Sequence, residues 1–382
     1  MRIAIIGCGY VADFYAATLC NHPELELQGV YDRNMERAKA HAEYYGVSNI
    51  YPSLEAVLGD DRVELIVNLT NPSSHFEISA AALEAGKHVY SEKPLAMDLQ
   101  HAEQLVEMAE ARGLQINGAP CTVLSETAQT IWKALRDGRI GTPRLVYAEL
   151  DDGNVPQHNF AEWVSASGAP WPAKDEFEVG CTLEHAGYYM TWLTAFFGPA
   201  KRMTSFSTVL QPDKGIALDV NTADYSTACI EFVSGPVARF TCSLYPPHDH
   251  RFRIFGDDGW LSTDQAWDYG SKVQISRHHR FSRRAERHPA LAKMMGLGPR
   301  RLPLVRKSKF VRDSKGANCM DFCRGVAETA SAARENRPSR LSAQWSLHVT
   351  ELVLCMQHPE IHGRPREIQS RFDPLAPMPW AQ

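Results

Sequence analysis

Residues 2–14, RIAIIGCGYVADF, decide the fold, because an apolar run stops there at two closely spaced glycines. The run over residues 2–6 is typical of a parallel strand that is buried on both faces. We expect Gly7 to allow a sharp turn, Gly9 to let a pyrophosphate approach bare backbone, and Ala12 to let the next helix pack closely. The pattern therefore predicts a dinucleotide site. Its expected contacts from this segment are Gly7, Gly9, Tyr10, Val11 and Ala12.

A carboxylate about 20 residues beyond the glycines supports this prediction. A second apolar strand, residues 27–31, ends directly before Asp32. A carboxylate at this place can accept hydrogen bonds from both ribose hydroxyls of NAD and would repel the extra phosphate of NADP. Arg33 follows it, and an arginine could hold that phosphate. The sequence predicts NAD as the cofactor and keeps NADP as the alternative.

Further pairs of strands and helices continue along the first third of the chain. Strands are expected over residues 63–69, 87–90 and 114–117, with helical stretches between them. This alternation predicts an α/β fold, a doubly wound parallel Rossmann sheet covered on both faces, in a domain spanning residues 1–121. Ligands of such sheets bind at the carboxyl ends of the strands. Three loops therefore face one crevice: residues 7–12, 70–75 and 91–94.

The third of these loops places a lysine at the end of a strand. Its sequence is Ser91-Glu92-Lys93-Pro94, in which the proline fixes the backbone behind the lysine. We expect Lys93 beside the nicotinamide. A surface lysine that points into water is the alternative, because most lysine side chains are exposed.

Three segments together resemble a known family. The glycine-rich segment, the loop TNPSSH (residues 70–75) and the segment AGKHVYSEKPLA (residues 85–96) are similar to the glucose-fructose oxidoreductase, inositol dehydrogenase and rhizopine-catabolism (Gfo/Idh/MocA) oxidoreductases. The resemblance is dense over residues 1–140 and looser beyond them. It implies that Lys93 contacts both substrate and nicotinamide. The contacts expected between these two loops and the cofactor are those of Thr70, Asn71, His75, Glu92 and Lys93.

The second-domain signature of that family, Asp-x-Gly-x-His-x-x-Asp, falls on GCTLEHAGYYMTW, residues 180–192, in altered form. Aligned on Gly187, His185 replaces the first aspartate, and Tyr189 replaces the catalytic histidine. Trp192 replaces the last aspartate. Some family members that act on sugars use tyrosine at the histidine position, so the resemblance implies a different subgroup.

We expect Tyr189 to move the proton of the substrate hydroxyl. A phenol is a poor base at neutral pH, but the ammonium of Lys93 and an oxidised nicotinamide would lower its pKa. Lys93 then holds the substrate oxygen, and His185 orients the substrate or relays the proton outward. His185 as the base is the rival assignment. Two hydrogen-bonded core residues are the structural alternative, since His185 and Tyr189 share one face of an apolar helix.

Residues 122–382 are expected to form an α+β domain with a large, mainly antiparallel, open-faced sheet. Hairpins are predicted over residues 225–244 and 253–262, each around a glycine-containing turn. The bare face of such a sheet predicts a homo-oligomer, a dimer or a tetramer, as the resemblance also implies. Helices over about 318–357 are expected to pack back on the first domain or on the sheet.

Two polar segments have more than one interpretation. The segment PPHDHR, residues 246–251, forms either a plain turn or a substrate contact. Residues 277–312 are rich in arginine and lysine. They form a solvated loop, a clamp for the diphosphate of a nucleotide sugar, or a patch that lies on an anionic membrane.

The composition argues against several classes of protein. A net charge of −5 provides no general attraction to nucleic acid. The nine cysteines lack the short paired spacings of a zinc site, so we expect no metal and reduced thiols in a cytoplasmic protein. The apolar runs predict neither a signal peptide nor a membrane helix.

The leading hypothesis is an NAD-dependent oxidoreductase that transfers a hydride between the nicotinamide and a secondary alcohol or ketone of a sugar or nucleotide sugar. One alternative is an NADP-dependent reductase of keto-sugars. Another is a non-catalytic dinucleotide-binding regulator or scaffold, which the changed signature at residues 185, 189 and 192 motivates.

Overall fold

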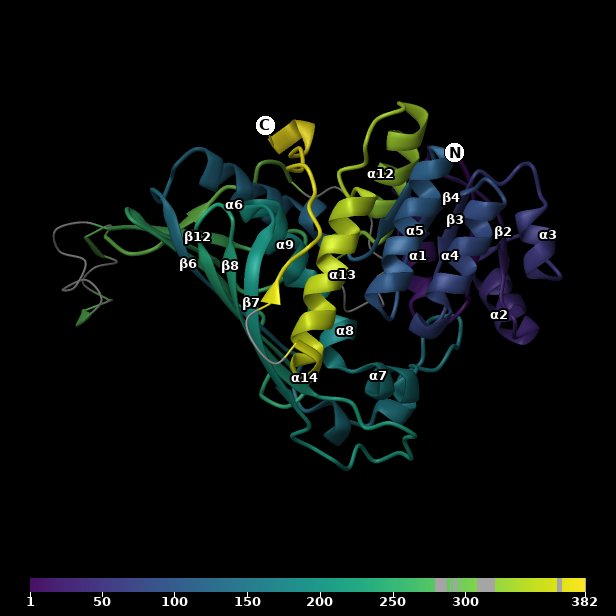
Figure 1. The fold of residues 1–382 in the computed structure, drawn as a ribbon, viewed down its shortest axis with the longest axis horizontal. Coiled ribbons are helices and arrows are strands. Elements are labelled where there is room, and N and C mark those ends of the chain that lie inside the picture. The colour runs from purple at the N-terminus through teal and green to yellow at the C-terminus, as the bar shows by residue number, and fades with distance from the viewer. Residues whose placement is uncertain are drawn as a thin grey trace.

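The chain folds into two halves, a parallel sheet between helices and a larger sheet with helices on one face (Figure 1). The computed structural model describes residues 1–278, 287–288, 290, 294–295, 297–307, 320–362 and 366–381. The predicted fold class, a Rossmann half followed by an α+β half, is confirmed.

The first half is a five-stranded parallel sheet in the order β2-β1-β3-β4-β5. Its strands are β1 (Arg2–Ile6), β2 (Glu26–Tyr31), β3 (Leu65–Asn68), β4 (His88–Ser91) and β5 (Ile116–Gly118). Strands β1 and β3 pair with each other and are almost completely buried. Continuous apolar runs are what strands covered on both faces require, which explains why the sequence locates them to within a few residues.

Helices with defined ends connect these strands. They are α1 (Ala12–Leu19), α2 (Met35–Tyr45), α3 (Leu54–Leu58), α4 (His75–Glu84) and α5 (Leu99–Arg112). The carboxylate of Asp98 caps α5 by accepting a hydrogen bond from the His101 N–H at 2.8 Å, and Gly113 ends the helix with φ of 66°. A short 3-10 turn, η1 (Pro72–Ser74), precedes α4.

The second half is built on a nine-stranded sheet in the order β13-β12-β11-β10-β6-β9-β8-β7-β14. Its strands are β6 (Pro143–Asp151), β7 (Ala200–Thr208), β8 (Tyr225–Phe232), β9 (Val237–Ser243), β10 (Phe252–Gly256), β11 (Gly259–Thr263), β12 (Val273–Arg277), β13 (Arg300–Leu302) and β14 (Arg366–Glu367). Among these described strands β6 and β9 pair in parallel and the other neighbours pair antiparallel. Both predicted hairpins, β8 with β9 and β10 with β11, are present.

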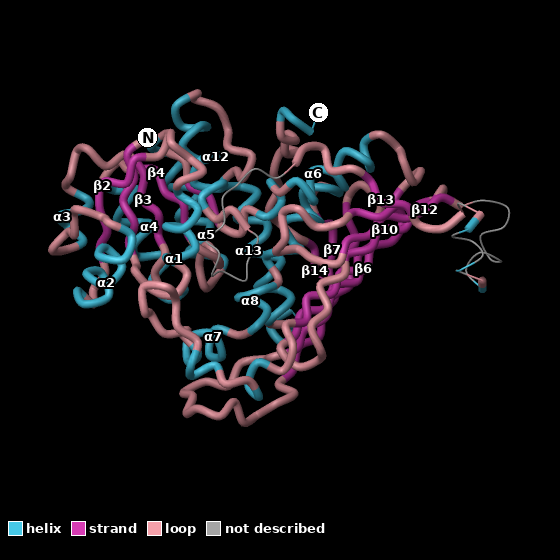
Figure 2. The backbone as a smooth tube through the Cα atoms, turned by 180° about the vertical axis from the view of Figure 1, so that it is seen from behind, coloured by secondary structure: helices cyan, strands magenta, loops and turns pink. Residues whose placement is uncertain are grey.

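The described helices cover one face of this sheet and leave the other without a helix (Figure 2). The covering helices are α6 (Glu126–Arg136), α8 (Cys181–His185), α9 (Gly187–Phe197) and α13 (Ala343–Gln357). On the open face, Phe206 of β7 is 57% exposed and Val237 of β9 is 39% exposed. The shorter elements of this half are η2 (Thr122–Leu124), η3 (Val155–Gln157), η4 (Phe160–Glu162) and α7 (Ala173–Val179).

The C-terminal helices lie between and beside the two halves (Figure 1). Helix α12 (Cys323–Arg334) contacts α1, β4 and β5, while α13 contacts α5 and β5 on one side and β7, α8 and α9 on the other. The remaining elements are α14 (Pro359–His362) and η5 (Pro379–Ala381). Residues 318–319, where the first of these helices was expected to begin, lie outside the described residues. We propose that the boundary between the two domains lies at residues 121 and 122.

Buried hydrogen bonds tie the C-terminal helices to strand β5. The side chain of Asn117, which is completely buried, donates to the carbonyl of Leu341 and accepts from the Thr329 hydroxyl at 2.7 Å. The Gly118 N–H donates to the Ser346 hydroxyl at 3.1 Å. A buried polar group without a partner is costly, so these bonds anchor α12 and α13 on the first half.

Replacing Thr329 by valine should lower the free energy of unfolding by roughly 1–3 kcal/mol, because it leaves the buried amide oxygen of Asn117 without its donor. Thr350→Val is the matched control, since the Thr350 hydroxyl donates to the Ser346 carbonyl of its own helix at 2.9 Å. Urea denaturation followed by circular dichroism measures both variants. Equal losses would contradict the anchoring role of Thr329.

Candidate active site

The glycine-rich turn after β1 is closely packed on one side and open on the other. Gly7 has φ of 96°, and a Cβ there would lie 2.5 Å from the Leu69 carbonyl oxygen. A Cβ at Gly9 would meet nothing within 4 Å, so bare backbone faces open space at this point. The Cys8 N–H donates to the Asp32 carboxylate at 2.8 Å, which fixes the turn to the end of β2.

A cavity of about 280 Å³ lies at the carboxyl ends of the parallel strands, between the two halves. The residues that the sequence predicts for the site and that line it are Gly9, Tyr10, Val11, Thr70, Asn71, His75, Glu92, Lys93 and His185. Gly7, Asp32 and Arg33 line an adjoining cavity of about 140 Å³, which shares Gly9, Thr70 and Asn71 with the first. An extended dinucleotide fits these residues, because bare backbone separates a carboxylate at one end from a lysine at the other.

Lys93 meets a carboxylate from the other half of the molecule. Its ammonium donates a hydrogen bond to Glu184 of α8, whose side chain is only 4% exposed. Burial lowers the pKa of Lys93, but the charges of Glu184 and Glu176 raise it by more, so the pKa lies above its ordinary value. The lysine is therefore a fixed positive charge at the floor of the cavity, and Glu184 holds it in place.

His185 enters the cavity beside this ion pair as a neutral imidazole. Burial lowers its pKa to about 4, against the opposing charge of Asp152, and Lys93 and His250 lower it further. Its Nδ1 atom lies 3.3 Å from a carboxylate oxygen of Asp152. A neutral imidazole can accept a proton at neutral pH, whereas a charged one cannot.

The two adjacent tyrosines of α9 face different surroundings. Tyr188 lines the cavity, with its ring 5.5 Å from that of Trp267, and burial raises its pKa. Tyr189 is completely buried, packs on the rings of Phe240 and Phe252, and donates its hydroxyl to the His250 carbonyl.

We therefore correct the assignment of Tyr189 as the group that moves the proton. Its hydroxyl is held inside the core and does not line the cavity that contains Lys93 and His185. Residues 188 and 189 stand three and four positions after His185, and both spacings bring side chains near one helix face, so spacing alone does not separate them. Tyr188 is the tyrosine that the structure brings into this cavity.

Sequence reasoning also missed carboxylates around the lysine. Glu184 and Glu176 line the cavity, and burial together with the charge of Glu184 raises the pKa of Glu176 to about 8. Asp152, directly after β6, approaches His185 from the sheet. A usable signal was present, because a glutamate inside the apolar stretch around Leu183 has to find a buried partner.

A loop between η4 and α7 closes the cavity over helix α1. The carboxylate of Asp13 accepts from the Ser165 hydroxyl at 2.6 Å, and from the N–H and the hydroxyl of Ser167, each at 2.8 Å. The Tyr45 hydroxyl donates to the same carboxylate at 2.9 Å. These bonds hold Trp171, further along the loop, at the wall of the cavity.

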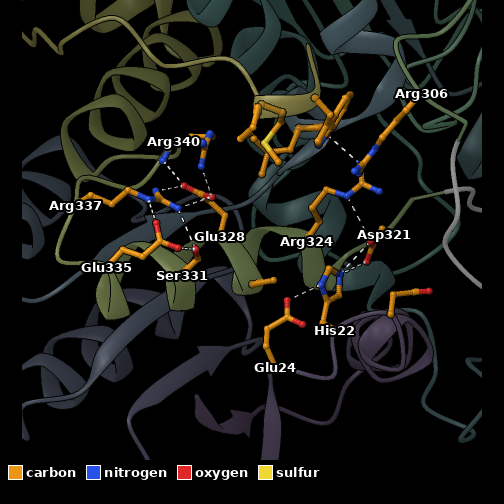
Figure 3. A pocket seen from close by; sticks show the side chains of 16 residues that line it. His22, Glu24, Arg306, Asp321, Arg324, Glu328, Ser331, Glu335, Arg337 and Arg340 are labelled. Carbon is orange, nitrogen blue, oxygen red and sulfur yellow. Dashed lines mark hydrogen bonds and ion pairs between the residues drawn. The ribbon is translucent and has the colours of Figure 1, made fainter. Parts of the chain in front are cut away.

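A larger cavity, of about 510 Å³, lies between the end of α1, helix α12 and η5 (Figure 3). Several arginines line it, but each one is paired with a carboxylate. The pairs are Arg306–Glu126, Arg324–Glu126, Arg324–Asp321, Arg337–Glu328 and Arg340–Glu328. Because these charges neutralise one another, we do not assign this cavity to a charged substrate.

The described part of the basic stretch lies away from the active-site cavity. Arg300 and Arg301 belong to β13 at the edge of the large sheet, and Arg306 stacks on the ring of Trp380 at 3.9 Å. Residues 279–286, 289, 291–293, 296 and 308–312 lie outside the described residues, so the diphosphate clamp and the membrane patch both stay hypotheses. In the part of the chain that the structure describes, no helix has the length and apolar character to cross a membrane.

Two family models match the chain. The oxidoreductase family model with an NAD-binding Rossmann fold matches residues 1–117, and the GFO/IDH/MocA C-terminal domain model matches residues 128–262. The chain belongs to the Gfo/Idh/MocA oxidoreductase family. The resemblance seen in the sequence is confirmed, and the protein is of the NAD(P)-binding Rossmann class.

Three of the similar curated proteins are named as dehydrogenases with different substrates. The UDP-N-acetylglucosamine 3-dehydrogenase of Acidithiobacillus ferrooxidans is 27% identical over 266 residues, which is 69% of this chain and 74% of the relative. The trans-1,2-dihydrobenzene-1,2-diol dehydrogenase of Bos taurus is 24% identical over 284 residues, or 74% of this chain and 79% of the relative. The D-glucoside 3-dehydrogenase of Escherichia coli is 37% identical over 115 residues, 30% of this chain and 32% of the relative.

Solved structures share the whole fold of this Gfo/Idh/MocA protein. An aldose-aldose oxidoreductase from Caulobacter crescentus, complexed with glycerol, superposes with a TM-score of 0.74 at 18% identity. The match covers 96% of this chain and 98% of that one. At this identity the likeness establishes the fold and leaves the substrate to be argued from the site.

Replacing Lys93 by methionine should destabilise the protein by roughly 3–5 kcal/mol, because Glu184 is left as a buried charge without its partner. The double variant Lys93→Met, Glu184→Gln should recover most of that loss, since the glutamine carries no charge. Chemical denaturation of the two single variants and the double variant measures the coupling. If the stability loss of the double variant equals the sum of the losses of the two single variants, the ion pair does not account for the destabilisation.

Proposed function

We propose that this protein is an NAD-dependent oxidoreductase that transfers a hydride between the nicotinamide and a secondary alcohol or ketone of a sugar. The observation that carries the proposal is the meeting of Lys93, His185 and Tyr188 in one cavity at the nicotinamide end of the crevice. Bound NAD would supply the acceptor or donor of the hydride. Gly9, Asp32 and the loop at residues 70–75 would hold it.

The side chains in the cavity divide the proton chemistry among them. Lys93 stays charged and polarises the substrate oxygen, which stabilises negative charge as the hydroxyl proton leaves. His185 is neutral and accepts that proton, so we adopt the rival assignment, with histidine as the base. Tyr188 keeps its proton, since burial raises its pKa, and donates a hydrogen bond to the substrate.

The walls of the cavity favour a sugar as the substrate. Trp171, Trp267 and Tyr188 offer aromatic faces for the C–H groups of a pyranose, and the carboxyl groups of Asp175 and Glu176 can form hydrogen bonds with its hydroxyls. Two similar proteins, named above, are dehydrogenases of a glucoside and of a nucleotide sugar. A nucleotide-linked sugar remains the alternative substrate.

A neutral histidine beside a charged lysine in one cavity is an arrangement suited to proton transfer, which favours an enzyme over a purely regulatory protein. The open face of the large sheet, with Phe206 and Val237 exposed, is where we propose that copies of the chain associate as a dimer or tetramer. A cytoplasmic location stays a prediction from the cysteine content.

NAD should bind at least 10-fold more tightly than NADP at the same salt concentration, because the Asp32 carboxylate accepts from the ribose and repels a phosphate there. Arg33 and Arg37 line the same cavity and oppose this preference. Asp32→Ala should shrink the difference, whereas the control Glu43→Ala, at an exposed position of α2, should not. Calorimetric titration measures each affinity. Tighter binding of NADP to the unmodified protein would reverse the cofactor assignment.

The unmodified protein should form NADH, measured at 340 nm, with at least one member of a panel of free sugars, methyl glycosides and nucleotide sugars. Tyr188→Phe should lower kcat/KM about 10- to 100-fold through the loss of one hydrogen bond to the substrate. Tyr189→Phe should keep turnover and lose roughly 1 kcal/mol of stability, because its hydroxyl lies in the core. The reverse pattern would restore the assignment to Tyr189, and no NADH with any substrate would contradict the function.

A further inference from the structure

A hydrogen-bonded chain of side chains reaches His185 from the large sheet. Asp152 follows the last residue of β6, His250 lies just before β10, and Gln265 lies just after β11. Strands β6, β10 and β11 are neighbours, so their adjacent ends bring these three residues together. His250 is 1% exposed and the Asp152 side chain 8% exposed, which makes this a buried network behind the cavity wall.

The direction of each hydrogen bond follows from the groups at the end of the network. The backbone N–H of Trp267 donates to Oε1 of Gln265 at 3.2 Å, which identifies that atom as the amide oxygen. Nδ1 of His250 lies 2.7 Å from the same oxygen, and its Nε2 lies 2.7 Å from Oδ1 of Asp152. Both partners are acceptors, so both ring nitrogens of His250 donate. His250 is therefore a buried cation that faces the carboxylate of Asp152.

Two atoms of this network have no hydrogen-bond partner among the residues that the structure describes. They are Oδ2 of Asp152 and Nδ1 of His185, both shielded from solvent and 3.3 Å apart. A carboxylate oxygen can only accept, so a proton on Nδ1 of His185 satisfies both atoms after a small adjustment. That proton leaves Nε2 as the unprotonated nitrogen of a ring that lines the cavity.

We propose that Asp152 is a positioning residue for the reaction: it holds the proton of His185 on Nδ1 and so presents Nε2 to the substrate hydroxyl as the acceptor. His250, held in turn by Gln265, keeps Asp152 ionised and correctly oriented. The base then takes the hydroxyl proton on Nε2 and becomes an imidazolium whose Nδ1–H remains paired with Asp152, so no proton is lost or added in the step. This inference rests on the proposed function.

The charges around His185 agree with this arrangement. Asp152 raises the pKa of His185, while Lys93 and His250 lower it, and burial lowers it most, to about 4. Folded protein below that pH would carry a protonated His185 and lose its base. The rate of alcohol oxidation should therefore stay level from about pH 7, below the pKa of Glu176, down to pH 5 and fall below pH 5.

Asp152→Asn tests the role directly, with Asp151→Asn as the matched control. The asparagine accepts from His250 through its oxygen and turns its NH₂ toward His185, which moves the histidine proton to Nε2. We expect kcat to fall about 100-fold with NAD affinity unchanged, and the acidic limb of the residual pH profile to move to lower pH. Asp151 is adjacent in an extended segment, where successive side chains point to opposite sides. Asp151→Asn should therefore leave kcat and the acidic limb of the pH profile unchanged.

A second measurement does not depend on turnover. Nitrogen-15 NMR of histidine-labelled protein distinguishes protonated from bare ring nitrogens, and the variants His185→Gln and His250→Gln identify the two signals. We expect His185 with its proton on Nδ1, His250 protonated at both nitrogens, and a reversed His185 in Asp152→Asn. A proton on Nε2 of His185 in the unmodified protein, or an unchanged kcat in Asp152→Asn, would overturn the proposal.

The same cluster offers a competing explanation that these data separate. Among the described residues, Asp152, His248 and His250 have ligand atoms within 4.8 Å of one another, a spacing at which a metal ion could bind. A metal-bound His250 would carry no hydrogen on the coordinating nitrogen. A bare ring nitrogen of His250 in the NMR spectrum, together with a metal found by elemental analysis, would overturn the hydrogen-bonded network. Absence of NADH formation with every sugar would reject the proposed function, while the histidine spectrum would still decide what Asp152 does.

Discussion

The buried ion pair between Lys93 and Glu184 is the interaction on which the candidate site depends. Lys93 follows strand β4 of the Rossmann half, and Glu184 lies on α8 of the sheet half, so one contact joins the two halves at the candidate site. A charge buried this deeply needs its partner, which fixes the position of α8 relative to the parallel sheet. His185 and Tyr188, which follow on the same stretch of chain, are thereby directed into the cavity.

The fold could be predicted because its signals are local. The strand that ends at Gly7, the carboxylate at Asp32 and the two hairpins of the second half each occupy a short segment whose pattern identifies it. The same holds for Lys93, since a lysine at the end of a parallel strand lies in the crevice by topology alone. Features of the fold that depend on long-range pairing could not be predicted. An example is the parallel pairing of β6 with β9 in an otherwise antiparallel sheet, which no local pattern indicates.

The chemistry of the site could be predicted only in part, because its partners come from distant segments. The family signature predicted the second of two adjacent tyrosines as the functional one. In the structure, Tyr189 points into the core and Tyr188 lines the cavity, because both lie on α9 about 100° apart around the helix. Asp152 and His250 are 98 positions apart in sequence and meet only because β6 and β10 are neighbours in the sheet. The burial of His185, which lowers its pKa, likewise depends on how the whole chain folds.

Helix α13 has a consequence for how the molecule selects its substrate. It contacts α5 and β5 on one side and β7, α8 and α9 on the other, so the two halves share one rigid wall. The Gly118 N–H bonds to Ser346 of this helix, and the Asn117 side chain bonds to Leu341 just before it, which fastens that wall to the Rossmann sheet. A shared helix of this kind opposes hinge bending, which needs the halves to move as independent bodies. The crevice is thus a preformed slot, and under the proposed function selectivity among sugars would depend more on the side chains that line it than on closure around the ligand.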